Sequence, residues 1–363
     1  MSYSPIDKPT NFFNSVLYTG NGSSPRSITG VGFQPDFNWT KSRSAGGSHV
    51  LANSVSGANK QLVSNNTSAE ATNGVYGYLS AFGSDGWTMT TGSSDFSRMN
   101  TNSTTYVSWN WLAGTSVSGN TTGSGTAKSY SGSVNTDSGF SMIKYIGNDN
   151  ASQTVPHHLG ATPSMVIVKN LDAAVDGWMV YHKDIESGKN NLLNDAAMPY
   201  NSSATGYTKG INGVPTSTNL TFVSGSTSNQ NVCGNNVNYI AYCFAQKKGY
   251  SKFSSYTGNG NADGTFVYLG FKPAFVITKL SSSAGEGWEI YNNKALGYNV
   301  DNNKLVANTS GAESTADRID LLSNGFKARI NSDGINKSGD TLIYMAFAES
   351  PFVSSTGVPA TAR

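Results

Sequence analysis

The stretch 255–291 decides the fold, because three versions of it run along the chain. It reads SYTGNGNADGTFVYLGFKPAFVITKLSSSAGEGWEIY. An earlier version, LYTGNGSSPRSITGVGFQPDFNWTKSRS, begins at Leu17, and a middle version, KYIGNDNASQTVPHHLGATPSMVIVKN, begins at Lys144. Each has a strand that ends in Tyr, an Asn/Gly turn, a Gly followed by a Pro, and an apolar strand that ends in Lys. The repeat is longer than the 20 to 50 or so residues of a solenoid unit, so it predicts tandem domains.

Four positions recur in all three versions and set the domain boundaries. They are Tyr18, Tyr145 and Tyr256; Gly32, Gly160 and Gly270; Pro35, Pro163 and Pro273; and Lys41, Lys169 and Lys279. Units of about 110 to 130 residues match the commonest size of a domain. We predict an N-terminal arm (1–14), β-sandwich repeats at 15–114, 139–248 and 249–352, a linker (115–138) and a C-terminal tail (353–363).

The segments outside the repeats are distinguished by composition. Residues 115–138 are rich in Gly, Ser and Thr, which cannot bury enough apolar surface to hold a structure, so a linker or flexible excursion is expected. The N-terminal arm contains Phe12 and Phe13 and should either dock on a neighbour or complete the first domain with a strand. The C-terminal tail is expected to be disordered or docked on a partner.

The strand pattern predicts an all-β fold of three tandem antiparallel β-sandwich domains of the jelly-roll or lectin-like type. Short alternating segments are separated by Gly/Asn turns, and helical periodicity is absent apart from one turn expected at 314–321. In the segment 238–245, Ile240, Tyr242 and Phe244 share one face, while Ala241 and Cys243 share the other. This pattern indicates a central strand that is packed on both sides.

Composition limits the classes of function. Charged residues make up 13% of the 363 residues and the net charge is +2, which gives no basic footprint for nucleic acid. No apolar stretch is long enough to insert into a membrane. The N-terminus has no basic region followed by an apolar core, so no classical secretion signal is expected there. Aromatic residues make up 11% and can build real cores, which argues against disorder.

Metal and disulfide chemistry is not expected. Cys233 and Cys243 are spaced unsuitably for a bond across a hairpin turn and are predicted to be two reduced thiols, with Cys243 in the core. The four histidines lack Cys, Asp or Glu partners at metal-ligand spacing, so structural or surface roles are predicted for His49, His157, His158 and His182. Residues 259–264 resemble half of a calcium loop but lack its closing Glu, because Gly270 stands there, so a plain turn is predicted.

No enzymatic constellation is present in the sequence. A glycosidase needs two carboxylates across a cleft, but no acidic position recurs in all three units, and Asp85, Asp263 and Asp317 lie in turn-like or surface contexts. A Gly-x-Ser-x-Gly nucleophile motif is also absent. We therefore predict a protein that is not an enzyme, with no catalytic, cofactor-binding or metal residues and no cofactor. The ligand-binding residues stay undetermined.

The aromatic residues can be interpreted in two ways, as a binding surface or as core. Exposed Tyr and Trp flanked by Asn can stack on sugars or fill interface pockets. Residues that recur are more simply explained as core, and this is the prediction for Tyr145, Tyr256, Trp178 and Trp288. A binding surface should instead use the loops, which differ between the units.

Several blocks resemble a family of bacteriophage virion proteins common in marine phages, labelled tail fibre or structural proteins and often given a lectin-like sandwich. These blocks are YTGNG, GVGFQPDF, YVSWNW, YIAYCFA, GFKPAFV and YMAFAESPF, and the resemblance covers about 17–352. It implies a virion component, assembled in the bacterial host cytoplasm, with other virion proteins as partners. It supplies no catalytic residues. The coiled-coil stalk of a long fibre is absent, which favours a compact ornament or short appendage.

Two functions follow as hypotheses. The first is adhesion of a tail-fibre or receptor-binding type to a host surface polysaccharide or protein, with several copies, as a homo-oligomer, adding avidity. The second is decoration or cementing of the capsid or tail. Exposed Trp and Tyr in a concave loop cluster would favour adhesion, and a large apolar patch at Phe12, Phe13 or the tail would favour assembly. A glycan-degrading enzyme is a distant third.

Overall fold

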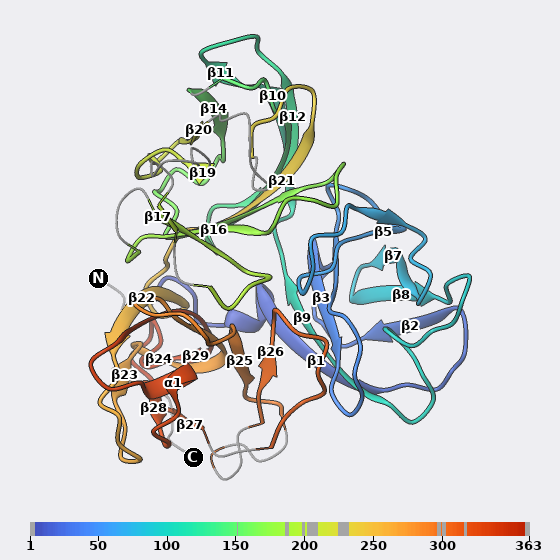
Figure 1. Cartoon of the computed structure of the whole chain (residues 1–363). Helices are drawn as coiled ribbons and strands as arrows, with labels where there is room; N and C mark the ends of the chain where they lie inside the picture. Colours follow the sequence, from blue (N-terminus) through green and yellow to red (C-terminus); the bar gives the residue numbers. More distant parts are fainter. Residues whose placement is uncertain are drawn as a thin grey trace.

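Nearly all of the chain is β-structure. The computed structural model describes residues 4–150, 152–185, 189–197, 200, 201, 210–223, 232–295, 299, 303–315 and 318–359. Strands account for 46% and helices for 2%, and the sheets are antiparallel. The all-β prediction is therefore confirmed (Figure 1).

The first unit contains strands β1 to β9 and a short 3-10 helix, η1 (Pro9–Asn11), before them. Its larger sheet has the order β1-β9-β3-β4 and its smaller sheet the order β2-β8-β7, with β5 and β6 as a separate pair. The bounds are β1 Phe13–Thr19, β2 Arg26–Thr29, β3 Phe37–Ser42, β4 Val50–Asn53, β5 Lys60–Gln61, β6 Ala71–Thr72, β7 Tyr78–Gly83, β8 Gly86–Thr90 and β9 Thr105–Trp111.

The third unit repeats this order with strands β22 to β29. The larger sheet is β22-β29-β24-β25-β26 and the smaller sheet is β23-β28-β27. The bounds are β22 Ser251–Thr257, β23 Phe266–Tyr268, β24 Phe271–Leu280, β25 Glu289–Asn292, β26 Leu305–Val306, β27 Ile319–Leu322, β28 Gly325–Ala328 and β29 Thr341–Pro351.

The second unit has the same core order, β13-β21-β15-β16, inside an eight-stranded sheet, β10-β12-β13-β21-β15-β16-β17-β18. Its smaller sheet is β11-β14-β20-β19. The bounds are β10 Thr115–Asn120, β11 Thr122–Gly123, β12 Ser129–Asn135, β13 Phe140–Ile146, β14 Gln153–Pro156, β15 Met165–Asn170, β16 Met179–His182, β17 Lys189–Leu192, β18 Tyr200–Asn201, β19 Gly210–Ile211, β20 Asn219–Val223 and β21 Asn238–Phe244.

The predicted linker at 115–138 is wrong, because most of this segment belongs to sheets. β10 pairs with β12 and β12 pairs with β13 in continuous antiparallel register. Most of β10 is exposed, so backbone hydrogen bonds rather than apolar burial hold it. A signal for β12 was present in the alternation of Tyr130, Gly132 and Val134, all buried on one face.

The helical turn expected at 314–321 is also misplaced. Residues Ile319–Leu322 form strand β27, and residues 316 and 317 lie outside the described part of the chain. The helical turn in the third unit is instead α1 (Asp333–Asn336). The alternation of buried Ile319 and Leu321 with the less buried residues between them is that of a strand.

The repeated glycines have a backbone reason. Gly32, Gly160 and Gly270 have φ values of +89°, +65° and +80°, which L side chains rarely adopt. Each lies just before its unit's long apolar strand, where the chain turns from the smaller sheet into the larger one. The repeat therefore marks a turn whose geometry favours glycine.

Each larger sheet has two apolar faces. One face packs on the smaller sheet of the same unit, and these contacts form three separate clusters, one per unit. In β21, Tyr239, Ala241 and Cys243 point into this local cluster, whereas Ile240, Tyr242 and Phe244 point the other way. The prediction that this strand is packed on both sides is confirmed.

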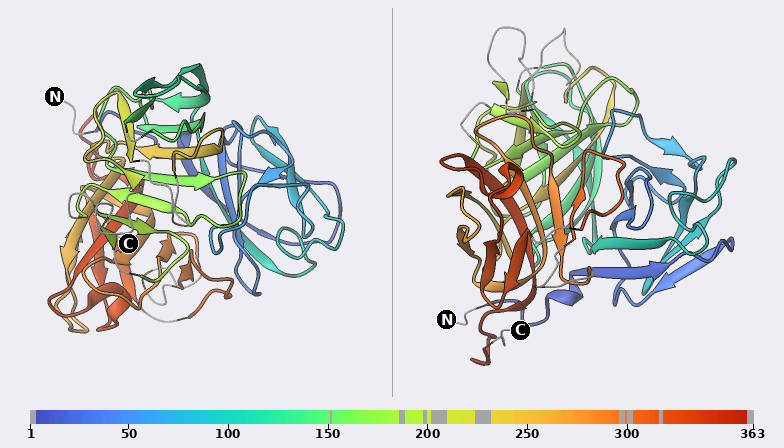
Figure 2. Two further views of the ribbon diagram at one scale, coloured as in Figure 1. Left: turned by 45° about the horizontal axis from the view of Figure 1, so that its top comes forward. Right: turned by 60° about the horizontal axis from the view of Figure 1, so that its bottom comes forward.

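The second faces of the three larger sheets meet in a single central core. Three rings at equivalent strand positions, Trp111, Phe244 and Phe347, form a triangle there. Their centroids lie 6.5 Å (Trp111 to Phe244), 6.0 Å (Phe244 to Phe347) and 5.7 Å (Trp111 to Phe347) apart. Figures 1 and 2 show the three units grouped about a common centre. Since the three larger sheets also share one core, the repeats form an approximate three-fold ring.

The chain ends close the ring. Ser4 donates a hydrogen bond to the Lys248 carbonyl (3.3 Å), and Asp7 accepts one from the Ser355 backbone N–H (2.6 Å). Phe12 packs edge-on against Tyr250, with centroids 6.1 Å apart, and Phe13 is buried in the central core. The N-terminal arm therefore does both things that the sequence allowed: it docks on another unit and leads into a strand of the first.

The shared core predicts that the chain unfolds in one cooperative transition. Phe347 is 1% exposed and contacts six other aromatic rings, so Phe347→Ala should destabilise the whole molecule by about 3–5 kcal/mol. Differential scanning calorimetry should show one transition at a lower temperature. Phe266→Ala, at a side chain 44% exposed, is the matched control and should change stability by about 0.5 kcal/mol or less. Separate transitions for separate units would contradict a shared core.

Candidate functional site

The repeated aromatic residues connect neighbouring units. Trp178 Nε1 in the second unit donates to the Val63 carbonyl in the first (3.0 Å), and Trp288 Nε1 in the third donates to the Leu192 carbonyl in the second (2.8 Å). Both indoles are buried. The prediction that Trp178 and Trp288 are core is confirmed, but the core that they complete lies between units.

In the first unit, His49 makes the equivalent contact to a neighbouring unit and so completes a ring of hydrogen bonds around the three units. Its Nδ1 accepts a hydrogen bond from Trp39 Nε1 (2.8 Å), so Nε2 carries the proton and donates to the Val306 carbonyl of the third unit (3.1 Å). Burial lowers the pKa of His49 to about 3, which keeps the ring neutral. His49 thus takes the place of Trp178 and Trp288, and each unit donates to one neighbour and accepts from the other.

The repeated lysines lie beside this ring and are buried. Lys169 Nζ donates to the carbonyls of Thr67 in the first unit (3.1 Å), Asn170 (2.9 Å) and Asp176 (3.0 Å). Lys279 Nζ likewise reaches the Ala196 carbonyl of the second unit (3.2 Å). Burial lowers the pKa of Lys41, Lys169 and Lys279 to about 8. These amines therefore bind carbonyls inside the molecule and are not positioned to act on a ligand.

The repeated tyrosines close one end of each unit. Tyr18, Tyr145 and Tyr256 donate to the carbonyls of Met99 (2.7 Å), Val232 (2.6 Å) and Ile335 (2.6 Å), respectively. Burial raises the pKa of all three hydroxyls well above 10. The structural role predicted for Tyr145 and Tyr256 is confirmed.

The remaining histidines and the cysteines also have structural surroundings. His157 and His182 are buried and contact the carbonyls of Thr216 and Tyr344, each at 3.1 Å, while His158 contacts the Tyr130 hydroxyl (2.9 Å). Cys233 and Cys243 are buried thiols and form no disulfide with each other, as predicted. Within the described residues, no group of three or more His, Cys, Asp or Glu side chains gathers as a metal site would require.

The acidic candidates are spread over the molecule. Asp85 accepts hydrogen bonds from the backbone of Gly30 (3.0 Å) and Gly32 (2.6 Å), whereas Asp263 forms an ion pair with Lys327. Asp317 lies outside the described residues. Asp263 belongs to the stretch 259–264, where Asn259 and Asn261 cap successive turns, as predicted for a plain turn. The structure does not bring Asp85 and Asp263 together.

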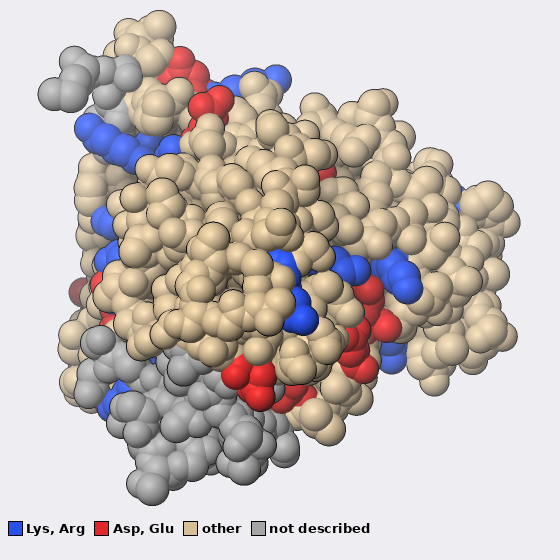
Figure 3. Space-filling model, turned by 90° about the horizontal axis from the view of Figure 1, so that it is seen from above, with Lys and Arg blue, Asp and Glu red and all other residues tan. Residues whose placement is uncertain are grey.

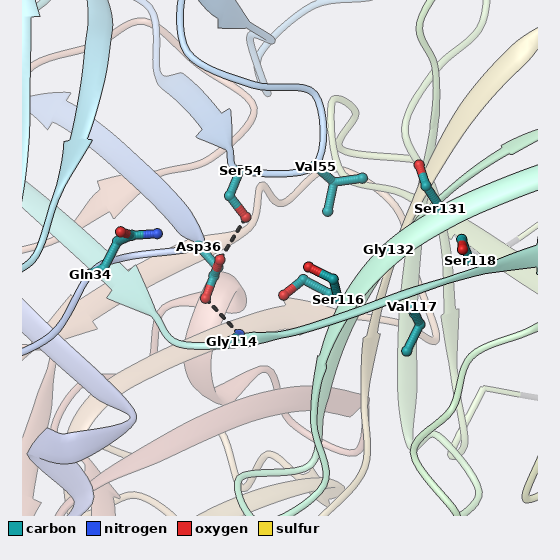
Figure 4. A pocket seen from close by; sticks show the side chains of 11 residues that line it. Gln34, Asp36, Ser54, Val55, Gly114, Ser116, Val117, Ser118, Ser131 and Gly132 are labelled. Atoms are coloured by element: carbon teal, nitrogen blue, oxygen red, sulfur yellow. Dashed lines mark hydrogen bonds between the residues drawn. The ribbon is translucent and has the colours of Figure 1, made fainter.

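A pocket of about 480 Å³ lies between the first unit and the β10–β12 ribbon of the second (Figure 4). Hydroxyl groups predominate in its lining, and we call it the serine-lined pocket. It is lined by Gln34, Asp36, Ser54, Val55, Gly114, Ser116, Val117, Ser118, Ser131, Gly132 and Ser133. This pocket could not be predicted from the sequence, because six of its eleven lining residues belong to the segment predicted to be a linker.

Asp36 organises one wall of the serine-lined pocket. One of its carboxylate oxygens accepts from the Ser54 hydroxyl (2.6 Å) and the other from the backbone of Ala113 (2.9 Å) and Gly114 (2.7 Å). Asp36 is 5% exposed, and its carboxylate holds the backbone just before β10 in place. The opposite wall needs Gly132, because a side-chain carbon there would lie 2.5 Å from the Met142 carbonyl oxygen.

The serine-lined pocket can form many hydrogen bonds but lacks an acid–base pair. Its serine hydroxyls can donate and accept, and Gln34 adds an amide. Among the described residues, Asp36 is the one carboxylate in its lining, and no second acid or base lines it. This lining suits a neutral, hydroxyl-rich ligand better than it suits hydrolysis.

Of the residue types that the adhesion hypothesis named, Tyr is exposed and Trp is not. All six Trp residues are buried, and the large aromatic side chains that are exposed in the described residues are Tyr76 (37%), Phe266 (44%) and Tyr268 (48%). Phe13 is buried and Phe12 is partly buried against the core, so neither forms the apolar patch named for assembly. On the face in Figure 3, residues other than Lys, Arg, Asp and Glu predominate among those that are described.

The fold and packing define a three-unit β-protein with a common core, and residues 8–351 match the family model described as Domain of unknown function (DUF7483). The chain belongs to this family. The match runs through all three units, in agreement with their shared core. No curated protein and no solved structure matches the chain. In the described part of the chain, no helix has the length and apolar character to cross a membrane.

The ring of hydrogen bonds between units predicts unequal effects of two Trp→Phe changes. Trp178→Phe removes the donor to Val63 and Asn66 in the first unit, whereas the buried Trp87 Nε1 has no hydrogen-bond partner among the described residues. Trp178→Phe should therefore cost about 1–3 kcal/mol more than Trp87→Phe, in which the same atoms are removed. Chemical denaturation measures both. Equal costs would show that the indole hydrogen bond contributes nothing to the junction.

Burial of the repeated lysines predicts a pH dependence. Because the pKa of Lys169 falls from 10.5 to about 8 on folding, the unfolded chain binds more protons between these values, and stability rises with pH across that window. One proton contributes at most about 1.4 kcal/mol per pH unit. Lys169→Met should lose this rise, so the stability gap between the natural protein and the variant should widen from pH 8 to pH 9.5. Urea denaturation at several pH values measures the gap, and a constant or shrinking gap would contradict the lowered pKa.

Proposed function

We propose that this chain is a non-enzymatic surface component of a bacteriophage particle and that it binds host surface glycans through the serine-lined pocket. The serine-lined pocket carries the proposal, because it presents five hydroxyls and an amide around a volume that fits a small ligand. The resemblance of the repeated blocks to virion proteins supplies the setting. Other virion proteins are then the partners, and a homo-oligomer would add avidity.

At the level of the fold, we propose that each pair of sheets is a lectin-like β-sandwich domain. The recurrence of one strand order in three units and the separate cluster between the two sheets of each unit support this. Since the larger sheets also share one core, the three domains are expected to act as one rigid body.

Decoration or cementing of the capsid or tail is the alternative. An exposed apolar patch at Phe12 and Phe13 would have favoured it. Both rings instead pack against residues of the same chain. A glycan-degrading enzyme is less well supported, because Asp36 is the single carboxylate of the serine-lined pocket and both of its oxygens are hydrogen-bonded.

Surface plasmon resonance with the purified chain over immobilised bacterial capsular polysaccharides and lipopolysaccharides tests the adhesion proposal. Saturable binding to at least one polysaccharide is expected. Ser116→Tyr, which fills the serine-lined pocket, should weaken that binding by tenfold or more, about 1.4 kcal/mol. Thr115→Tyr is the control, because Thr115 is the exposed neighbour that does not line the pocket.

Two outcomes would overturn parts of the proposal. Binding to emptied phage particles without binding to any polysaccharide would leave decoration as the function. Antibody labelling of particles of a phage that encodes the chain tests the virion location separately, and unlabelled particles would remove it.

A further inference from the structure

A second pocket lies where the first unit meets the third, and its lining differs from that of the serine-lined pocket. It has a volume of about 330 Å³ and is lined mainly by Gly47, Ser48, Tyr76, Ser97, Arg98 and Ser310. We call it the arginine pocket. It combines a cation, an aromatic ring and several hydroxyls, and its volume is within the range of small-molecule sites, about 300–1,000 Å³.

Arg98 packs on Tyr76, and no carboxylate of the described residues lies within ion-pair distance of its guanidinium. Its guanidinium lies 4.6 Å from the centre of the Tyr76 ring, and its backbone N–H donates to the Tyr76 carbonyl (3.1 Å). Within the described residues the guanidinium forms no ion pair. The Asp95 carboxylate attracts it from a greater distance and accepts a hydrogen bond from the Ser97 backbone N–H (2.8 Å). A half-buried guanidinium with open space beside it is suited to a ligand carboxylate, which it can bind through two parallel hydrogen bonds.

The third unit supplies an internal comparison for this pocket. Gly47 corresponds to Glu286, because each lies two residues before the ring residue of its unit, His49 or Trp288. Arg98 corresponds to Gly334, because each directly precedes the residue whose carbonyl accepts from the repeated tyrosine.

In the third unit, protein carboxylates fill the equivalent corner. A side-chain carbon added at Gly334 would lie 2.8 Å from Glu286 Oε2 and 2.5 Å from Glu289 Oε1. Glu289 is paired in turn with Lys304 and with Arg318, the latter at 3.8 Å. Charge is therefore balanced inside the third unit.

In the first unit, both carboxylates are missing and a cation is present. Gly47 stands for Glu286, and Val50, which is buried in the local core, stands for Glu289. Arg98 occupies the position of Gly334 and lines the pocket together with Gly47. The space that a glutamate side chain fills in the third unit is therefore open in the first, and a guanidinium borders it.

We infer that the arginine pocket binds the carboxylate of an acidic sugar. Arg98 pairs with the carboxylate, while the hydroxyls of Ser48 and Ser97 reach the hydroxyls of the sugar ring. This inference rests on the proposed glycan binding and adds a ligand class to it: uronic or sialic acid units, at a site separate from the serine-lined pocket.

Titration calorimetry on the full chain tests the inference with matched pairs of acidic and neutral sugars. The probes are oligogalacturonate and its methyl ester, glucuronate and glucose, oligomannuronate and oligomannose, and N-acetylneuraminic acid and its methyl ester. At least one acidic sugar should bind, and its neutral counterpart should bind at least tenfold more weakly. Added salt should weaken the binding of the acidic sugar. Arg98→Met, which keeps an aliphatic chain over Tyr76, should reduce binding of the acid at least tenfold.

Gly47→Glu gives the first unit the carboxylate that the third unit has at the equivalent position, Glu286. The new carboxylate should occupy the arginine pocket and compete with the ligand, so binding of the acid should again fall at least tenfold while the melting temperature holds or rises. A side-chain carbon at Gly47 approaches only the Ser42 hydroxyl, at 3.2 Å, so the change can be accommodated. Thr126→Glu places the same charge on an exposed turn far along the sequence and should leave binding unchanged.

Three outcomes would overturn the inference: equal binding of acid and neutral partner, binding that survives both Arg98→Met and Gly47→Glu, or no binding of any acidic sugar at millimolar concentration. Such a failure is distinguishable from failure of the proposed function. Neutral polysaccharides could still bind in a manner sensitive to Ser116→Tyr and insensitive to Arg98→Met.

Discussion

The structure depends on one constraint: each larger sheet has two apolar faces, and its own unit can cover only one of them. A sheet with large apolar side chains on both faces must be packed on both. The smaller sheet supplies one layer, and the other two units supply the rest. The triangle of Trp111, Phe244 and Phe347 is the centre of that arrangement. The units are therefore tandem in sequence but interdependent in packing.

The polar contacts around this core give the ring a direction. Trp178, Trp288 and His49 each donate to a carbonyl of the neighbouring unit, and the acceptors, Val63, Leu192 and Val306, are themselves equivalent. Apolar packing alone would tolerate several arrangements of three similar units. Directional hydrogen bonds to buried carbonyls favour one of them, because any other arrangement leaves donors and acceptors unpaired.

The sequence predicted what lies within a unit better than what lies between units. Tyr145 and Tyr256 were correctly assigned to the core because they recur at a fixed distance from the turn, and their partners are in the same unit. Trp178 and Trp288 recur too, but their acceptors are more than ninety residues away in another unit, and spacing carries no information about such a partner. Repetition therefore indicated that the two Trp residues are structurally important, but it did not indicate which residues they contact.

The candidate sites were harder to predict, and for a physical reason. The serine-lined pocket uses a ribbon that is held mainly by backbone hydrogen bonds, so its sequence lacks the strong apolar alternation of a buried strand. The arginine pocket depends on a glycine and an arginine far apart in the sequence, at positions where the units diverge. Divergence between repeats is visible in the sequence, but its meaning depends on which side chains face one another across the junction.

Covalent connection of the three units changes how such a ring can evolve. In a trimer of identical subunits, every substitution appears three times, and a cation gained at one junction is gained at all of them. In this chain each junction can vary alone, as His49 and the two tryptophans illustrate. A ring of this kind can keep two junctions for cohesion and adapt the third. It then offers one binding site to a ligand, whereas a symmetric trimer would offer three.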